Sequence, residues 1–60
     1  MIEITRLNDK ELFINSELIE LIELTPDTTI TMTTGRKIIA KESVDDIIDK
    51  IVSYRKRINI

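Results

Sequence analysis

The chain has 60 residues, a net charge of −2 and neither cysteine nor histidine, which excludes disulfides, thiolate zinc sites and imidazole chemistry. A chain this short forms one domain over residues 1–60 and buries only about 60% of its surface on folding. Its composition of 13 isoleucines, one phenylalanine, one tyrosine and no tryptophan predicts a core of branched aliphatic side chains and few rings for stacking bases.

Apolar runs are short throughout the chain. None approaches the roughly 18 residues that span a membrane, and the first residues lack the charged-then-apolar order of a signal peptide. We therefore expect a cytoplasmic protein without a transmembrane segment.

The first third predicts a β-hairpin. Ile2 and Ile4 alternate with polar residues in an expected strand over about 2–7, and a second strand is expected over about 11–14. Asn8 and Asp9 lie between them and tolerate the backbone angles of a tight turn.

Residues 18–24 leave two interpretations open, because their apolar spacing fits a short helix and a strand buried on both faces equally well. Pro26 ends the pattern within about two helical turns, which is shorter than the ~11 residues of a usual helix. We therefore expect a turn over 15–18 and a strand over about 19–25. Pro26 and Asp27 then form a corner, in which the aspartate accepts hydrogen bonds from the following amides.

The central stretch predicts a second hairpin, with strands over about 28–33 and 36–41. Ile30 and Met32 share one face of the first strand, and threonines occupy the other. Gly35 is the only glycine of the chain, and we expect it to take a positive φ at the end of a three-residue loop.

This hairpin matches the first at a constant offset of 26 residues. The match fits an internal duplication, but any two short hairpins share such a pattern, and we favour the second interpretation.

The last third predicts a helix over about 44–57. Ser43 is a good N-cap, and Asp46 stands at the capping-box distance from it. Acidic residues in the first turn and basic residues in the last turn suit the helix dipole. The apolar face is expected at Val44, Ile47, Ile48, Ile51 and Val52. We expect this face to cover the sheet, so that Ile48→Asp would unfold the domain.

Together these elements predict an α+β fold: a small five-stranded antiparallel curled sheet, similar to an SH3-like half-barrel, with two hairpins, a linking strand and one C-terminal amphipathic helix. Phe13 and Ile39 lie on the strand parity opposite to their apolar neighbours. One set must face outward, so we expect a homo-oligomer in which a second subunit covers it.

The polar residues predict no enzyme, cofactor or metal site. The carboxylate pairs Asp45–Asp46 and Glu20–Glu23 are expected on solvated faces, because a domain this small has no room for a deep pocket. The basic residues Arg36, Lys37 and Lys41, with Lys10, fit two interpretations. They could bind a partner, or they could protect an edge strand from aggregation, and we favour the second.

Several short pieces resemble one known family in their order and spacing, namely the small flagellar protein FlbD, also called swarming motility protein SwrD. The resemblance covers almost the whole chain, although family members commonly have glycine at the position of Asp9 and asparagine at the position of Thr34. The pieces are Ile4-Thr5-Arg6-Leu7-Asn8, Asn15 with Ile19 and Ile22, Pro26-Asp27-Thr28, Gly35 with Lys37, and Lys41-Glu42-Ser43-Val44.

Such a resemblance implies a bacterial, cytoplasmic, non-enzymatic protein that supports swarming by raising the power of the flagellar motor. The implied partner is the stator or another basal-body component at the inner membrane. The resemblance identifies no contact residues and brings no catalytic motif. We therefore predict the partner-binding residues from the sequence pattern alone. They are Arg36, Lys37, Lys41, Phe13 and Ile39.

An alternative function is RNA binding, because a short β-rich chain beginning Ile4-Thr5-Arg6 distantly resembles the carbon storage regulator CsrA. The negative net charge and the scarcity of aromatic residues weigh against it. Filter binding at two salt concentrations discriminates, since binding through phosphates weakens as salt rises.

Overall fold

The structure is a computed structural model that describes residues 1–25 and 27–58. Within that part, all expected elements are present, and each begins and ends within two residues of its expected position. Pro26, predicted at a corner, lies outside the described residues. In chain order the elements are β1 (Ile2–Thr5), β2 (Glu11–Ile14), the 3₁₀ helix η1 (Ser16–Leu18), β3 (Ile19–Glu23), β4 (Thr28–Met32), β5 (Lys37–Ala40) and α1 (Val44–Ile58).

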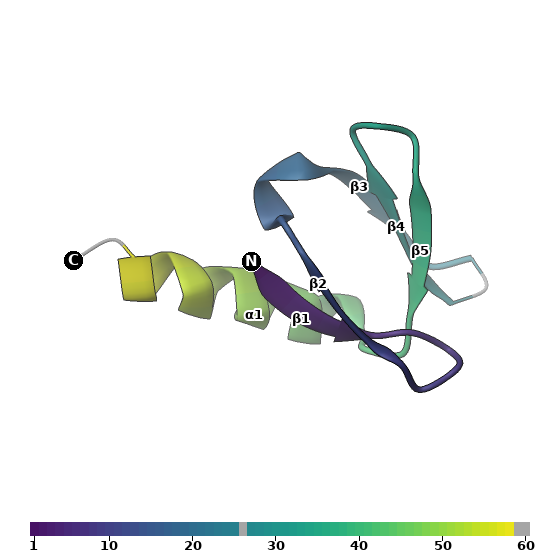
Figure 1. Cartoon of the computed structure of the whole chain (residues 1–60), viewed down its shortest axis with the longest axis horizontal. Helices are drawn as coiled ribbons and strands as arrows, with labels where there is room; N and C mark the ends of the chain where they lie inside the picture. Colours follow the sequence, from purple (N-terminus) through teal and green to yellow (C-terminus); the bar gives the residue numbers. More distant parts are fainter. Residues whose placement is uncertain (26, 59–60) are drawn as a thin grey trace.

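The strands form two antiparallel sheets, β1-β2 and β3-β4-β5, which Figure 1 shows on different sides of the molecule. The α+β class is confirmed, but the prediction of one five-stranded sheet is wrong. The sheets meet at a single bridge between Arg6 and Ala40, beside which the Lys41 N–H donates to the Thr5 carbonyl at 2.8 Å. Pairing between the sheets does not extend past this bridge, because β5 ends at Ala40 on one side and the first hairpin turns after Arg6 on the other. The barrel is therefore not closed, and the SH3-like half-barrel stays a prediction.

The two hairpins have the same register. Ile2 lies opposite Ile14 in the β1-β2 pair, and adding 26 to both numbers gives Thr28 opposite Ala40 in the β4-β5 pair. The same offset relates the other three residue pairs of each hairpin. Thr28 is therefore buried on the core face beside Ile30 and Met32, although the sequence pattern predicted threonines only on the other face.

The turns of the hairpins also correspond. In the first, the Asp9 N–H donates to the Arg6 carbonyl at 2.9 Å. In the second, the Gly35 N–H donates to the Met32 carbonyl at 2.8 Å. The left-handed position falls on Asp9, with φ 69°, and on Gly35, with φ 91°. The positive φ predicted for Gly35 is thus confirmed.

Strand β3 explains why its sequence fitted both a helix and a strand. Its pairing with β4 shifts between Ile19 and Leu21, so that Glu20 forms a bulge. Beyond the bulge, the positions whose side chains face the core shift by one residue. Ile19 and Ile22 therefore both pack against the core, although they are three residues apart. Leu21 is 42% exposed, so β3 is not buried on both faces as expected.

The core lies between the inner faces of the two sheets and is closed along one side by α1 (Figure 1). The helix contacts β1 chiefly. Its fully buried residue is Ile47, and Ile51 and Tyr54 pack beside it, whereas Ile48 is 47% exposed. The prediction that Ile48 meets the sheet is therefore wrong. The buried core residues are Ile2, Ile4, Ile14, Ile30, Met32, Ile38, Ala40 and Ile47.

Local polar contacts fix the remaining corners. Ser43 caps α1 as predicted, because its Oγ accepts a hydrogen bond from the Asp46 N–H at 3.1 Å. Asn15 caps η1 by accepting from the Glu17 N–H at 3.0 Å. At the corner before β4, the hydrogen bond differs from the prediction: the Asp27 backbone carbonyl, rather than its side chain, accepts from the Thr29 hydroxyl at 3.2 Å.

Candidate functional site

A groove lies on the side where β5 faces the first hairpin. It consists of two hollows of about 400 Å³ and 230 Å³, and Arg36 and Ile38 belong to the walls of both. We call it the inter-sheet groove. The larger hollow is lined by Arg6, Leu7, Asn8, Arg36, Lys37, Ile38 and Ile39, and the smaller by Leu12, Phe13, Ile14, Asn15, Leu18, Met32, Thr34, Arg36 and Ile38.

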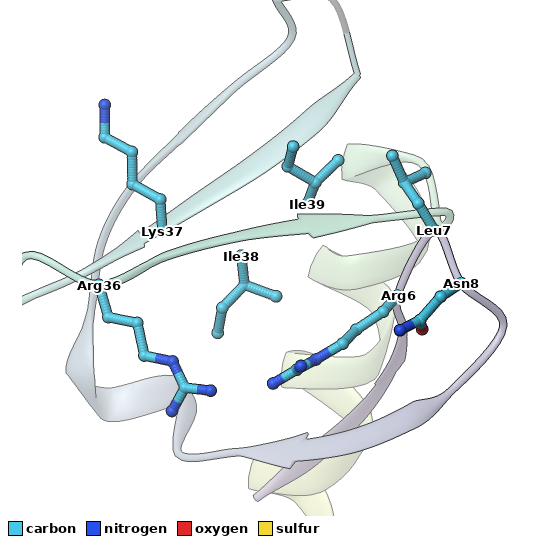
Figure 2. A pocket seen from close by; sticks show the side chains of 7 residues that line it. All are labelled: Arg6, Leu7, Asn8, Arg36, Lys37, Ile38 and Ile39. Carbon is cyan, nitrogen blue, oxygen red and sulfur yellow. The ribbon is translucent and has the colours of Figure 1, made fainter.

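Two arginines from different hairpins point toward one another in the larger hollow, as Figure 2 shows. Arg6 follows the end of β1, and Arg36 precedes the start of β5. The side chain of Ile38 lies between them, while Lys37 and Ile39 point to the other side of β5. Like charges that converge repel each other, so this arrangement favours an anionic group between them.

Three cationic residues and no acidic residue line the larger hollow, and two of them, Arg6 and Arg36, direct their side chains into it. In residues 1–25 and 27–58, the ion pairs join Lys41 to Asp9 and Arg55 to Glu17, and neither arginine of the hollow takes part. The chain carries a net charge of −2, so the basic character of this hollow is local.

Strand β5 presents a free edge to the groove. The Met32 N–H donates to the Arg36 carbonyl at 2.8 Å. In an antiparallel pair such bonds recur at every second residue, so Ile38 and Ala40 also turn their backbone groups toward β4. The backbone groups of the residues between them, Lys37 and Ile39, therefore point away from β4. The N–H and C=O of Lys37 have no partner in the described part of the chain, whereas the Lys41 N–H is bonded to Thr5 and the Arg6–Ala40 bridge sets the Ile39 C=O beside Leu7.

The structure brings some of the predicted partner-binding residues together and separates others. Arg36, Lys37 and Ile39 all line the larger hollow. Phe13 is 63% exposed and lines the smaller hollow. Lys41 instead forms an ion pair with the turn residue Asp9.

Sequence reasoning missed Arg6. A signal was present, because Ile2, Ile4 and Arg6 share one strand parity, and the first two are buried. A charged residue on the core-facing parity must leave the core at the end of its strand, where it lies at the rim of an opening.

The strand junction beside the groove is held by Glu42. Its carboxylate accepts from the Thr5 N–H at 2.9 and 3.1 Å and from the Thr5 hydroxyl at 2.9 Å. Partial burial acts to raise the pKa of Glu42, but these hydrogen bonds, with the charge of Lys50, outweigh burial and lower it below the ordinary 4.5. This contact fastens the end of β1 to the start of α1 and so positions Arg6.

Two structural findings bear on other classes of function. Within the described residues, no cluster of three or more acidic, histidine or cysteine side chains has the arrangement of a metal site. In the same part of the chain, no helix has the length and apolar character needed to cross a membrane.

Comparison with known proteins identifies the family. The family model FlbD, described as flagellar and swarming motility proteins, matches residues 1–59. The chain belongs to the FlbD family. The suspected family resemblance is thus confirmed, and both hairpins and the helix lie within the matched region. FlbD proteins are described by their part in motility and not by a reaction. No curated protein matches this FlbD chain, and no solved structure matches it either.

Proposed function

We propose that this FlbD protein supports the power of the flagellar motor through non-enzymatic contact with the stator or another basal-body component. Membership of the FlbD family supports a role in flagellar motility. The inter-sheet groove supports the mode of action, because its converging arginines and free strand edge offer a binding surface. The observation that carries the proposal is the pair Arg6 and Arg36, directed into one hollow without a carboxylate in its walls.

The proposed contact surface centres on the groove and its rim. Arg36 and Lys37 supply charge at the start of β5, while Phe13 and Ile39 supply apolar area, with 63% and 42% of their surface exposed. Large exposed apolar side chains near charged groups are typical of interaction sites. Lys41, also predicted to bind the partner, lines neither hollow and instead joins the two hairpins through its ion pair with Asp9.

Deletion of the gene in its flagellated host tests this function. We expect loss of swarming, with motors that still assemble but rotate against a load with reduced torque. Complementation with Phe13→Ser or Ile39→Ser is expected to restore less torque than complementation with Leu24→Ser. Leu24 is a suitable control because it is 66% exposed and lies outside the groove. Normal torque in the deletion strain would contradict the proposal.

We also propose that the protein self-associates. Ile48 and Val52 on α1 are 47% and 43% exposed, which leaves an apolar strip on the helix for a second copy to cover. The mass in solution, measured by light scattering over a range of concentrations, tests this. A monomer mass at every concentration would contradict it.

The proposed location is the cytoplasm, beside the motor at the inner membrane, where a stator or basal-body partner is accessible. The converging arginines would also suit phosphate, as the RNA-binding alternative requires. The larger hollow, however, has no aromatic side chain in its walls on which a base could stack. Filter binding of RNA at low and high salt discriminates between the two functions, because the FlbD proposal predicts no binding at either concentration.

A further inference from the structure

We propose that the inter-sheet groove binds a short, extended, carboxylate-bearing segment of the protein partner, which adds as a strand to the free edge of β5. This inference rests on the proposed function and deepens it by assigning the chemistry of the partner. The bound segment would place a carboxylate between Arg6 and Arg36.

The backbone of β5 offers hydrogen-bonding groups to a peptide strand. Lys37 directs its N–H and C=O toward the groove without a partner in the described part of the chain, and Ile39 has the same orientation beside the Arg6–Ala40 bridge. An added strand satisfies such groups at every second residue. The free edge ends where Ala40 pairs with Arg6, so the edge accommodates about four residues, or about 13 Å of extended chain.

Positive charge lies on each side of that edge. The side of the added strand that faces the core would meet Arg36 and Arg6 across Ile38. A carboxylate there can accept paired hydrogen bonds from a guanidinium, and it removes the repulsion between the two arginines. The opposite side would lie beside Lys37 and Ile39, which suits acidic and apolar side chains in alternation.

The free edge of β5 distinguishes a peptide from a phosphate-bearing ligand. A nucleic acid or a lipid headgroup would use the arginines but would leave the backbone N–H and C=O of Lys37 unsatisfied. Unpaired backbone groups in a covered groove are costly. A peptide strand is the ligand that uses both features of the site.

The proposal is tested with a capped eight-residue peptide of alternating glutamate and valine, titrated into the full-length ¹⁵N-labelled protein. We expect the amide resonances of Lys37 and Ile39 to shift and to become protected from hydrogen exchange. Two control peptides separate the contribution of the carboxylates from that of the backbone amides. One replaces every glutamate with glutamine, and the other carries N-methyl groups on alternate amides, and we expect each to bind at least about tenfold more weakly.

Variants of the protein test the arginines. Arg6→Gln with Arg36→Gln is expected to weaken binding of the glutamate peptide by about tenfold or more. The matched control is Lys56→Gln with Arg57→Gln, which removes the same charge from exposed positions on α1 and is expected to bind as the parent chain does. Far-ultraviolet circular dichroism verifies that each variant folds.

Several outcomes would overturn the proposal. They are the absence of shifts at millimolar peptide, equal binding of the glutamine peptide, and shifts that centre on α1 instead of β5. Saturable binding of an RNA oligonucleotide or of phosphatidylglycerol vesicles at the same arginines, tighter than that of the peptide, would also overturn it in favour of a phosphate ligand.

A measurement in cells separates this inference from the function on which it rests. Suppose that the deletion strain loses torque and that the Arg6→Gln, Arg36→Gln variant, at normal abundance, restores it fully. The proposed binding of a partner segment in the groove is then wrong, and the motility function stands. If the deletion strain keeps normal torque, the motility function is wrong whatever the peptide result.

Discussion

Asp9 and Gly35 occupy equivalent positions in the two hairpins, 26 residues apart, and both adopt a positive φ, at 69° and 91°. The turns around them repeat the same backbone hydrogen bonds, from residue 9 to residue 6 and from residue 35 to residue 32. Both hairpins therefore need a residue that tolerates the left-handed conformation. One has glycine for this purpose, and the other has aspartate.

Replacement of Gly35 measures the cost of this conformation directly. A Cβ atom at position 35 would meet nothing within 4 Å, so its effect comes from the backbone angle and not from a clash. We expect Gly35→Ala to lower the free energy of unfolding by about 1–2 kcal/mol. Gly35→Asn is expected to cost less, because asparagine tolerates this region. Urea unfolding measures both, and equal stability of the alanine variant and the parent chain would refute the argument.

Replacement of Asp9 examines the strained turn. Asp9→Gly and Asp9→Ala both remove the ion pair with Lys41, so the difference between them isolates the backbone. We expect the glycine variant to be the more stable by about 1–2 kcal/mol. Urea unfolding of both variants measures the difference. If alanine is tolerated as well as glycine, the turn does not require a left-handed residue in solution.

The orientation of α1 predicts a contrast between neighbouring isoleucines. Ile47 is fully buried, while Ile48 is 47% exposed. We expect Ile47→Asp to unfold the domain, because a buried charge costs more than the stability of a small domain, and Ile47→Ala to cost about 2–5 kcal/mol. At a concentration low enough to keep the chain monomeric, Ile48→Asp should change stability by less than about 1 kcal/mol. Thermal unfolding compares the three, and a folded Ile47→Asp variant would contradict the assigned helix face.

Glu42 predicts a pH dependence of stability. Because hydrogen bonds from Thr5 lower the pKa of Glu42 in the folded state, its contribution is complete above the ordinary value of 4.5 and is lost as pH falls through the lowered value. Glu42→Gln is therefore expected to cost about 1 kcal/mol at neutral pH and progressively less in acid. Unfolding curves at several pH values measure this, and a constant difference between the two proteins would exclude the mechanism. Glu20→Gln, at an exposed carboxylate on β3, controls for the change in net charge.

Local chemistry made most elements of the fold predictable from the sequence. Gly35, Ser43 and the alternating strands act through their nearest neighbours, and the structure confirms them. The split into two sheets was not predictable, because it depends on how the first hairpin meets β5, which it does at the Arg6–Ala40 bridge. The rotation of α1 toward Ile47 and the bulge at Glu20 likewise follow from packing between distant segments.

The candidate site was only partly predictable for the same reason. The pattern placed Arg36 and Lys37 at the start of an edge strand, but it could not bring Arg6 from the other hairpin to the same hollow. Their convergence depends on the Arg6–Ala40 bridge and on the Glu42–Thr5 contact, which joins residues 37 positions apart in the chain.

The central claim is that this chain acts on the flagellar motor through its outer surface, and the stall torque of single motors tests it most directly. Rotation of beads attached to flagellar stubs would be recorded in the deletion strain and in the same strain carrying the parent gene. We expect reduced torque without the protein and full torque with it. Equal torque in the two strains would contradict the account.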